Sequence, residues 1–395
     1  MSHKFIFSLL LPVFFLLNSC GSNSHSDGSP QTFTLQEKEF LHTLFLTEYL
    51  WYDQVTSTVD YTQFAAPQEM INQLRIDPPD KWSFTMTQQQ YEDFANQKTV
   101  GFGFGFTTDL QIFLVRIDSP AYGKLLRGDK IIQINGEDAS SSLIREASQN
   151  VNKTAVFSLL RNGSMVDVTV TPGEYTFKVS LGKIITKGSK KIGYLRYDSF
   201  TESSVAEFET IFTTFHNENI NELVIDLRYN GGGSLAAASS LIDNIISNHS
   251  GQRQMYLDWN DNYKNRNANY TFEDADMQDG NELTMQRIIF LVTKNSASAS
   301  EALINALKPY LGDTNVITVG EETHGKPVGM SGRTYGQNYY FLINFFVKNN
   351  ADETTSFNGI PVTCTAEDDT SRIMGDENET MLSAALFYIQ NNTCP

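Results

Sequence analysis

Three short segments of the sequence could carry covalent chemistry, and the first is rich in glycine. Residues 226–233 read DLRYNGGG. Consecutive glycines let backbone N–H groups converge without interference from Cβ atoms, and ahead of a helix such groups bind an anion or a developing oxyanion. The segment lacks the spacing of a phosphate-binding loop. An oxyanion site and a purely structural turn are the two interpretations that remain.

The second segment offers a hydroxyl nucleophile. Residues 296–301 read SASASE and lie between an apolar run and a predicted helix. Small neighbours expose the hydroxyl of Ser298, and the dipole of the helix that follows favours an alkoxide developing there. The same letters also form a capping box, in which Ser298 and Glu301 bond to each other's backbone amides. Capping alone is therefore the alternative.

The third segment offers a base. Residues 320–326 read GEETHGK and follow another apolar run. A lysine serves as a general base only where burial lowers its pKa from about 10.4 toward neutrality, so Lys326 must be buried to act. An exposed loop lysine is the alternative. His324 is the one rival base, and the six histidines form neither an apparent serine–histidine–acid triad nor an H-E-x-x-H metal motif.

The elements around these segments alternate between strand and helix. Four apolar runs predict strands, and three stretches with helical periodicity predict helices. The strands are 192–197, 222–227, 288–292 and 316–319, and the helices are 204–215, 235–246 and 299–310. Such alternation predicts an α/β domain with parallel strands and functional loops at their carboxyl ends. The polar stretch 251–283 is expected to be an insertion loop.

Two other regions precede this domain, which we place at 176–395. Residues 34–96 carry apolar side chains at helical spacing, broken by prolines, and predict a small helical domain. Residues 97–175 change to short β-like runs separated by glycine, with a hairpin turn at Asn162-Gly163. The strands expected in this β-rich module are 100–106, 111–117, 130–134, 156–160 and 166–170.

The order of the three segments, and the residues in them, resemble the C-terminal processing (tail-specific) peptidases, which use a Ser-Lys dyad. The resemblance covers residues 98–390, and its motifs are specific. It implies a crotonase-like α/β core with Ser298 as the nucleophile and Lys326 as the base. It also implies an oxyanion hole made by the backbone amides of Ala299 and of Gly232 or Gly233. Neither a metal nor an organic cofactor is implied.

The β-rich module fits the same family. Residues 101–106 read GFGFGF and look like the carboxylate-binding loop of a PDZ domain, a match that SPA at 119–121 and LRGDKIIQING at 126–136 strengthen. Backbone amides of such a loop hold a free C-terminal carboxylate while the peptide adds as a strand. The residues expected to bind a peptide C-terminus are Gly103, Phe104, Gly105 and Phe106. The alternative is a strand whose phenylalanines only fill the core.

Two features depart from the family's pattern. Members commonly carry a glutamine four residues after the lysine, where this chain has Met330. Methionine cannot donate an amide hydrogen bond, so another group must orient Lys326 or the dyad is weaker. The spacing between Ser298 and Lys326 is also a little long, and residues 312–315 are the expected extra turn.

The N-terminus resembles a bacterial lipoprotein signal. Lys4 precedes an apolar run at 5–17, which is shorter than the roughly 20 residues of a spanning helix, and Ser19-Cys20 resembles a lipobox. We expect residues 1–20 to be the signal, Cys20 to be lipidated, and residues 21–33 to be a flexible tether. The protein would then be anchored to a membrane of the bacterial cell envelope, facing the periplasm or the exterior. A plain signal peptide and an uncleaved anchor are the alternatives.

Export also bears on the two remaining cysteines. Under oxidising conditions Cys364 and Cys394 could pair and tie the C-terminal helix to the preceding loop. Two free buried thiols are the alternative.

Composition and charge limit the partners. Lysine and arginine number 29 against 46 aspartates and glutamates, and the net charge of -17 argues against nucleic-acid binding through phosphate neutralisation. The sequence thus predicts a lipid-anchored serine endopeptidase that cleaves unfolded or tail-recognised polypeptides with free C-termini. A non-catalytic peptide- or ligand-binding protein on the same fold is the alternative.

Overall fold

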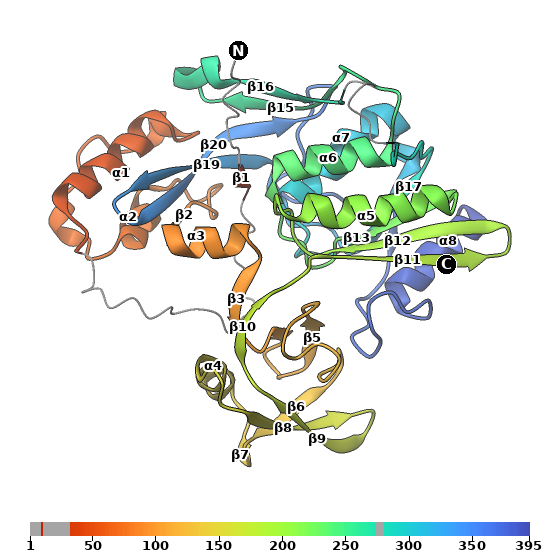
Figure 1. Cartoon of the computed structure of the whole chain (residues 1–395). Coiled ribbons are helices and arrows are strands. Elements are labelled where there is room, and N and C mark those ends of the chain that lie inside the picture. The colour runs from red at the N-terminus through yellow and green to blue at the C-terminus, as the bar shows by residue number, and fades with distance from the viewer. Residues whose placement is uncertain (1–8, 11–31, 274–279) are drawn as a thin grey trace.

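The computed structural model describes residues 9–10, 32–273 and 280–395. Figure 1 shows an α/β core on one side, helices and a long hairpin on the other, and a β-rich module that projects from both. Cys20 and most of the predicted tether lie outside the described residues. Within the described ranges, no helix is both long enough and apolar enough to cross a bilayer.

The α/β core is built on a six-stranded sheet in the order β11-β12-β13-β17-β18-β21. The first pair is antiparallel and the other neighbours are parallel. The strands are β11 (Ser180–Lys187), β12 (Lys190–Tyr197), β13 (Glu222–Asp226), β17 (Ile288–Val292), β18 (Val316–Gly320) and β21 (Cys364–Thr365). All residues of β13, β17 and β18 are buried, which explains the apolar residues that make up most of each strand. The four predicted strands and their parallel direction are confirmed.

Helices cover both faces of this sheet (Figure 1). They are α5 (Ser204–Asn217), α6 (Leu235–Ile245) and α7 (Ala299–Leu311) on one face and α8 (Thr380–Asn391) on the other. Alternate residues of each strand face opposite ways, so Leu223 and Ile225 pack with the first three helices and Val224 packs with α8. After α7, Gly312 and the short turn η5 (Asp313–Asn315) form the expected extra turn before β18.

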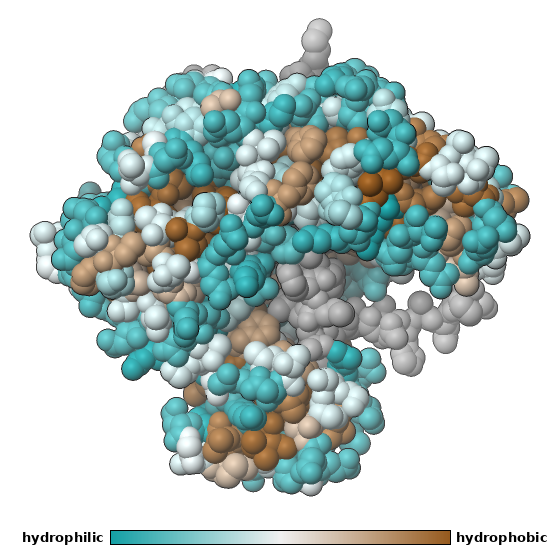
Figure 2. Space-filling model, turned by 180° about the vertical axis from the view of Figure 1, so that it is seen from behind, coloured by the Kyte–Doolittle hydropathy of each residue, from teal (hydrophilic) through white to brown (hydrophobic). Residues whose placement is uncertain are grey.

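The β-rich module is joined to the rest by two paired strands. Its elements are β3 (Lys98–Gly101), β4 (Phe104–Phe106), β5 (Ile112–Val115), β6 (Lys130–Ile134), β7 (Glu137–Asp138), α4 (Ser141–Gln149), β8 (Ala155–Arg161), β9 (Ser164–Val170) and β10 (Gly173–Thr176). Strands β3 and β10 pair where the chain enters and leaves. The prediction of one strand over 100–106 is wrong, because Gly103 adopts φ +86° and separates β3 from β4. Hydrophobic surface shows on this module in Figure 2.

The N-terminal helical region shares its core with a distant hairpin. Its elements are α1 (Leu35–Thr47), η1 (Tyr52–Gln54), η2 (Tyr61–Gln63), α2 (Pro67–Leu74), β2 (Phe84–Thr87) and α3 (Gln88–Ala95). Strand β2 pairs with β20 (Asn338–Lys348), which forms a hairpin with β19 (Val328–Tyr335). Apolar side chains of α1, α2 and the hairpin form one cluster. Residues that we assigned by sequence to the peptidase domain therefore complete the N-terminal region.

The stretch 251–283 is not simply an insertion loop. It contains β15 (Arg253–Trp259), η3 (Asp261–Arg266) and β16 (Ala268–Thr271), and β15 pairs with β20. Met255, Leu257 and Trp259 are buried at alternate positions, as expected for a strand with one covered face. The abundant polar residues around them hid this short alternation.

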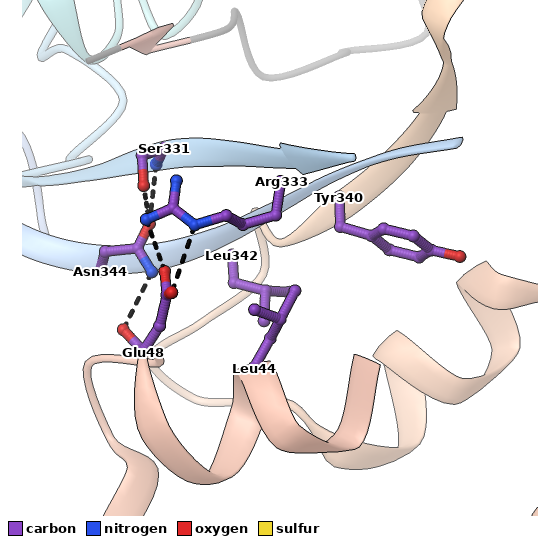
Figure 3. A pocket seen from close by; sticks show the side chains of 7 residues that line it. All are labelled: Leu44, Glu48, Ser331, Arg333, Tyr340, Leu342 and Asn344. Carbon is purple, nitrogen blue, oxygen red and sulfur yellow. Dashed lines mark hydrogen bonds and ion pairs between the residues drawn. The ribbon is translucent and has the colours of Figure 1, made fainter. Parts of the chain in front are cut away.

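Polar contacts also join α1 to the hairpin, as Figure 3 shows. Glu48, just after α1, forms an ion pair of 2.7 Å with Arg333 of β19. The side-chain amide of Asn344 donates to the Glu48 carbonyl at 2.9 Å and its oxygen accepts from the Ser331 amide at 2.7 Å. The polar groups around this small pocket thus form hydrogen bonds and an ion pair with one another, and these contacts attach α1 to the hairpin.

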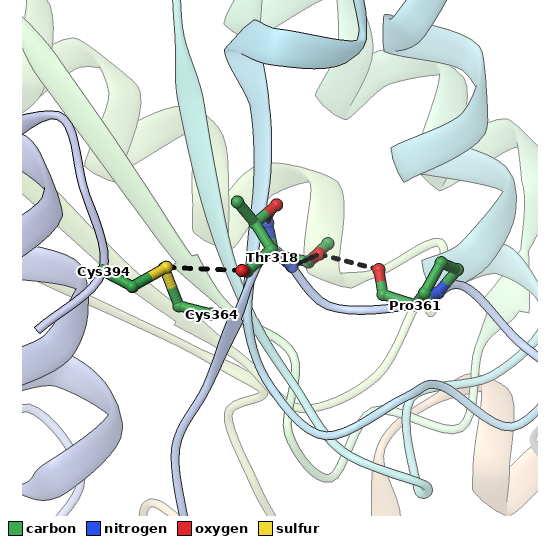
Figure 4. Close-up of a disulfide and its surroundings, with 5 residues drawn as sticks. Thr318, Pro361, Cys364 and Cys394 are labelled. Carbon is green, nitrogen blue, oxygen red and sulfur yellow. Dashed lines mark hydrogen bonds between the residues drawn. A yellow bond between two sulfur atoms is a disulfide. The ribbon is translucent and has the colours of Figure 1, made fainter.

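A disulfide joins Cys364 of β21 to Cys394 after α8 (Figure 4). The two Cα atoms are 5.5 Å apart and the bond closes a loop of 30 residues. The bond ties the C-terminal helix to the edge of the central sheet.

Candidate active site

The sheet order brings the three sequence segments together. The loops 226–233, 293–298 and 321–327 follow β13, β17 and β18, which are neighbours in the sheet. Backbone bonds join the loops: Ala297 N–H donates to the Asn230 carbonyl at 3.1 Å, and His324 N–H donates to the Ser296 carbonyl at 2.9 Å. Because parallel strands end at one edge of a sheet, the three segments form one site there.

Ser298 stands apart from the two serines that flank it. Its backbone has φ +63° and ψ -114°, an unusual conformation for a residue other than glycine and one found most often at functional sites. Its buried Oγ has no hydrogen-bond partner among the described residues. Ser296 Oγ donates to the Leu227 carbonyl at 2.8 Å, and Ser300 Oγ donates to the Asn230 carbonyl at 2.9 Å. The flanking serines hold the glycine-rich loop, whereas the hydroxyl of Ser298 has no partner among the described residues.

Glu301 joins the serine turn to the lysine loop. Its Oε2 accepts the backbone N–H groups of Ser298 at 2.9 Å and Lys326 at 2.8 Å. Its Oε1 accepts the N–H of Gly325 at 2.7 Å and the hydroxyl of Thr323 at 2.6 Å. Burial raises the pKa of Glu301, and these bonds oppose that effect. Only half of the capping box is present, since the Ser298 side chain makes no cap bond.

Lys326 is buried, with 2% of its surface exposed, so the interpretation as an exposed loop lysine is wrong. Burial lowers its pKa to about 7, while the carboxylates of Asp80 and Glu301 act in the opposite direction. An amine with such a pKa is partly neutral near pH 7, as a general base requires. Gly325 has φ +86°, and a Cβ there would lie 2.2 Å from the carbonyl oxygen of Phe357. Only glycine fits at that point of the loop.

His324 is poorly placed to be the base. The indole N–H of Trp82 donates to its Nε2 at 3.0 Å, which occupies the nitrogen that would accept a proton. Burial, together with the positive charges of Lys81 and Lys326, lowers the pKa of His324 to about 4. Within the described ranges, no three His, Cys, Asp or Glu side chains lie close enough to hold a metal ion.

The glycine-rich loop lies against Ser298. Gly232 has φ +104°, and a Cβ on it would come within 2.8 Å of the Ser298 Cβ and 2.9 Å of the Ala299 nitrogen. The N–H of Gly232 is engaged, since it donates to Oδ1 of Asn230 at 2.9 Å. Glycine is therefore required at this position for close approach, while its amide already has a partner.

The backbone N–H of Gly233 points to the side of the loop that is opposite to Phe200. Phe200 N–H donates to the Gly232 carbonyl, and Ser234 N–H donates to the Phe200 carbonyl. Because successive residues of an extended chain direct their backbone groups to opposite sides, Gly233 N–H faces away from Phe200. On that side β1 (Leu9–Leu10) pairs antiparallel with β14 (Gly233–Ser234).

The predicted peptide-binding residues of the β-rich module are largely buried. Phe104 and Phe106 belong to its hydrophobic core, together with Phe102. Gly103 keeps its carbonyl bonded to the Arg116 amide at 2.9 Å. Strand β4 pairs with β5 along one edge, and its other edge has no partner strand in the described part of the chain. The phenylalanines thus fill the core of the module.

Sequence reasoning missed the contacts between this module and the glycine-rich loop. Arg127 of the module bonds to the hydroxyl of Tyr229 and to the carboxylate of Asp368. The rings of Phe113 and Tyr229 are 5.0 Å apart. Arg228, fully buried, pairs with Asp226, Asp368 and Glu379. Residues 226–229 therefore belong to a polar network that holds the start of the glycine-rich loop against the β-rich module.

Two family models match the sequence. The Peptidase S41 N-terminal domain matches residues 36–84, and Peptidase family S41 matches residues 191–363. The chain belongs to peptidase family S41. The matched ranges contain all three loops of the site, and the N-terminal range contains Asp80.

Named relatives agree with this assignment. The carboxyl-terminal-processing protease of Picosynechococcus sp. is 27% identical over 224 residues, which are 55% of this chain and 50% of the relative. A CtpA-like protein of Staphylococcus aureus is 24% identical over 282 residues, 69% of this chain and 53% of the relative. The chain thus spans about half the length of these curated relatives.

An S41-type protein from Bacteroides fragilis NCTC 9343 has a crystal structure that aligns with a TM-score of 0.78 at 24% identity. The alignment covers 94% of this chain and 100% of that one. This likeness shows that the whole described arrangement is an S41 peptidase fold.

Proposed function

We propose that this chain is a serine endopeptidase in which Ser298 is the nucleophile and Lys326 is the general base. The observation that carries the proposal is the state of Ser298: a strained backbone and a buried hydroxyl without a partner in the described ranges. One carboxylate oxygen of Glu301 binds the backbone of both residues, so the serine and the lysine are held in one unit. Burial lowers the lysine's pKa to about 7, as a base at neutral pH requires.

The reaction would proceed through an acyl-enzyme. The neutral amine of Lys326 takes the proton of Ser298 Oγ as the oxygen forms a bond to the scissile carbonyl carbon. The backbone amide of Ala299, at the start of α7, stabilises the oxyanion together with Gly233 or Gly232. Gly233 is favoured, because the Gly232 amide already donates to Asn230. The Lys326 ammonium then protonates the leaving amine, and water hydrolyses the ester.

The substrate would be an extended polypeptide. Gly233 and Ser234 form a short extended segment at the proposed oxyanion donor, and a substrate strand would pair with it. Main-chain pairing of this kind recognises an extended backbone without regard to the side chains, and an unfolded chain can provide such a backbone. The open edge of β4 would bind a free C-terminal tail in a PDZ-like manner, through the loop that begins at Gly103.

The protein would act in the bacterial cell envelope, anchored by a lipid on Cys20. The disulfide between Cys364 and Cys394 supports export, because disulfides persist in oxidising compartments. A crotonase-like origin of the α/β core is consistent with its parallel sheet and is proposed on the family resemblance.

Cleavage of a reduced and alkylated protein by the form that starts at residue 21 tests the proposal. Ser298→Ala, at matched concentration and equal thermal stability, is the control. Cutting by the parent alone supports the peptidase. If both are folded and neither cuts, the proposal fails, and finite binding of tail peptides would favour the non-catalytic alternative.

A further inference from the structure

Position 330 cannot orient the catalytic lysine. Met330 is fully buried and belongs to the apolar cluster that contains Tyr49 and Trp82 of the N-terminal region. Its thioether offers no hydrogen-bond donor. A polar partner for Lys326 must therefore come from another element.

The N-terminal region supplies a buried carboxylate near this position. Asp80 is fully buried and accepts four hydrogen bonds. Its Oδ1 accepts the backbone N–H groups of Trp82 at 2.8 Å and Ser83 at 2.9 Å. Its Oδ2 accepts the hydroxyls of Tyr49 at 2.9 Å and Ser83 at 2.5 Å. These donors stabilise a negative charge inside the protein and fix its position.

Two hydrogen bonds attach the Asp80 turn to the elements around the lysine. Ser83 Oγ accepts the backbone N–H of Ile343, which is the residue paired with Met330 in the hairpin. The Trp82 indole donates to His324, two residues before Lys326. The carboxylate is thus held beside the strand position where family members carry the glutamine.

The charges that face Lys326 come from several elements. The negative charges of Asp80 and of Glu301 in α7 act to raise the pKa of Lys326, against the effect of burial. Glu301 directs its oxygens to three backbone amides and the hydroxyl of Thr323. His324 and the exposed Lys81 are the other titratable groups nearby. The oxygens of Asp80 are bonded to Tyr49, Trp82 and Ser83, and no ion pair within 4.0 Å joins this carboxylate to Lys326 in the described ranges, so the two groups interact through charge without a hydrogen bond.

We propose that the Asp80 carboxylate acts on Lys326 through its negative charge, in place of the hydrogen bond that a glutamine at position 330 would offer. Its negative charge stabilises the ammonium that forms when Lys326 takes the proton of Ser298. The inference rests on the proposed peptidase function. It also makes the N-terminal region part of the catalytic machinery, because the carboxylate comes from the loop between α2 and β2.

Asp80→Asn tests the proposal. Asparagine has the same shape, and the hydroxyls of Tyr49 and Ser83 can turn from donating to accepting, so we expect the variant to fold. Without the negative charge the pKa of Lys326 falls further, and the acid limb of kcat against pH moves to lower pH by about one unit or more. The plateau kcat falls about tenfold or more, because the ammonium is less stabilised, while KM changes little.

Tyr49→Phe is the matched control. It removes one hydrogen bond from the Asp80 carboxylate and keeps the charge, so the acid limb should stay where it is in the parent. If the acid limb of Asp80→Asn coincides with that of the parent, or if Tyr49→Phe moves it as far, Asp80 is only structural and the proposal fails.

A second measurement separates this inference from the proposed function. If the parent cuts nothing, the peptidase proposal fails, but Lys326 still titrates. The stability difference between the parent and Lys326→Met then reports its pKa, because this difference begins to change with pH at that value. The onset should lie at lower pH in the Asp80→Asn background, and an unmoved onset would overturn the role of Asp80.

Discussion

The indole N–H of Trp82 donates to Nε2 of His324 at 3.0 Å, across 242 residues of sequence. This bond ties the N-terminal region to the loop that carries the proposed base. The bond also occupies the lone pair on Nε2 with which His324 would accept a proton. Together with a pKa of about 4, it makes His324 a structural residue at the edge of the site.

The roles of His324 and Lys326 can be separated by substitution. We expect His324→Gln to keep kcat within about tenfold of the parent, since glutamine retains an acceptor for the indole N–H. We expect Lys326→Ala to lower kcat by about 10⁴-fold or more, as loss of a base does in other serine peptidases. Peptidase assays at one pH with matched enzyme concentration suffice. An active Lys326→Ala variant beside an inactive His324→Gln variant would assign the base to His324.

The three serines of the turn should respond differently. Ser298→Ala should abolish cleavage and change the free energy of unfolding by no more than about 0.5 kcal/mol, because its Oγ has no partner in the described structure. Ser296→Ala and Ser300→Ala each remove one buried hydrogen bond to a carbonyl that keeps its backbone donor, and each should lower that free energy by about 0.5–1.5 kcal/mol. Denaturant unfolding and cleavage assays check both. Loss of cleavage only in Ser296→Ala or Ser300→Ala would contradict the assignment.

The buried lysine should also make stability depend on pH. The pKa of Lys326 is lowered to about 7 in the folded chain, against about 10.4 in the unfolded chain. Between these values the unfolded state binds more protons, so this residue contributes stability that rises with pH across the window. The parent should gain stability relative to Lys326→Met from pH 7 to pH 10, measured by denaturant unfolding. A constant difference over that range would show that the lysine is not desolvated.

Glu301 should matter for both fold and rate. In Glu301→Gln the side-chain NH₂ group would face backbone N–H donors in place of a carboxylate oxygen, so we expect a loss of about 2–4 kcal/mol in stability. The displaced serine and lysine should lower kcat with little change in KM. Thr323→Val is the control: it removes one of the four bonds to Glu301 and the bond from the Ile360 N–H, but leaves the amides of Ser298 and Lys326 bonded to the carboxylate, so it should have a smaller effect on kcat. Equal effects of the two variants would argue against this role.

The disulfide should contribute stability without contributing to catalysis. Closing a loop of 30 residues stabilises the folded state by about 3–4 kcal/mol in the loop-entropy model. The double substitution of Cys364 and Cys394 by serine should lose that amount and keep kcat, since the bond lies at β21 and after α8. Guanidinium unfolding of the variant and of the reduced parent should coincide. An unchanged midpoint would show that the bond is not formed in solution.

The central sheet and its three loops could be predicted from the sequence. Strands that are buried on both faces appear in the sequence as apolar runs. Glycines and serines mark the loops that follow β13, β17 and β18. These signals are local, so a single sequence contains them. The short alternation in β15 and the hairpin β19–β20 escaped notice, because polar neighbours obscure the first and the second has its partners in the N-terminal region.

Only the tertiary structure decided which side chains complete the site. The sequence identified Ser298 and Lys326 as candidates through type and spacing, while the choice among three serines depends on which hydroxyls find carbonyl partners in the loop after β13. The sequence around Asp80 gave no indication of a role, because the turn that carries Asp80 meets the hairpin, more than 240 residues away, through a hydrogen bond of its neighbour Ser83. Spacing along a chain encodes helices, strands and turns, whereas the electrostatic environment of a buried amine is set by groups that meet only when the chain has folded.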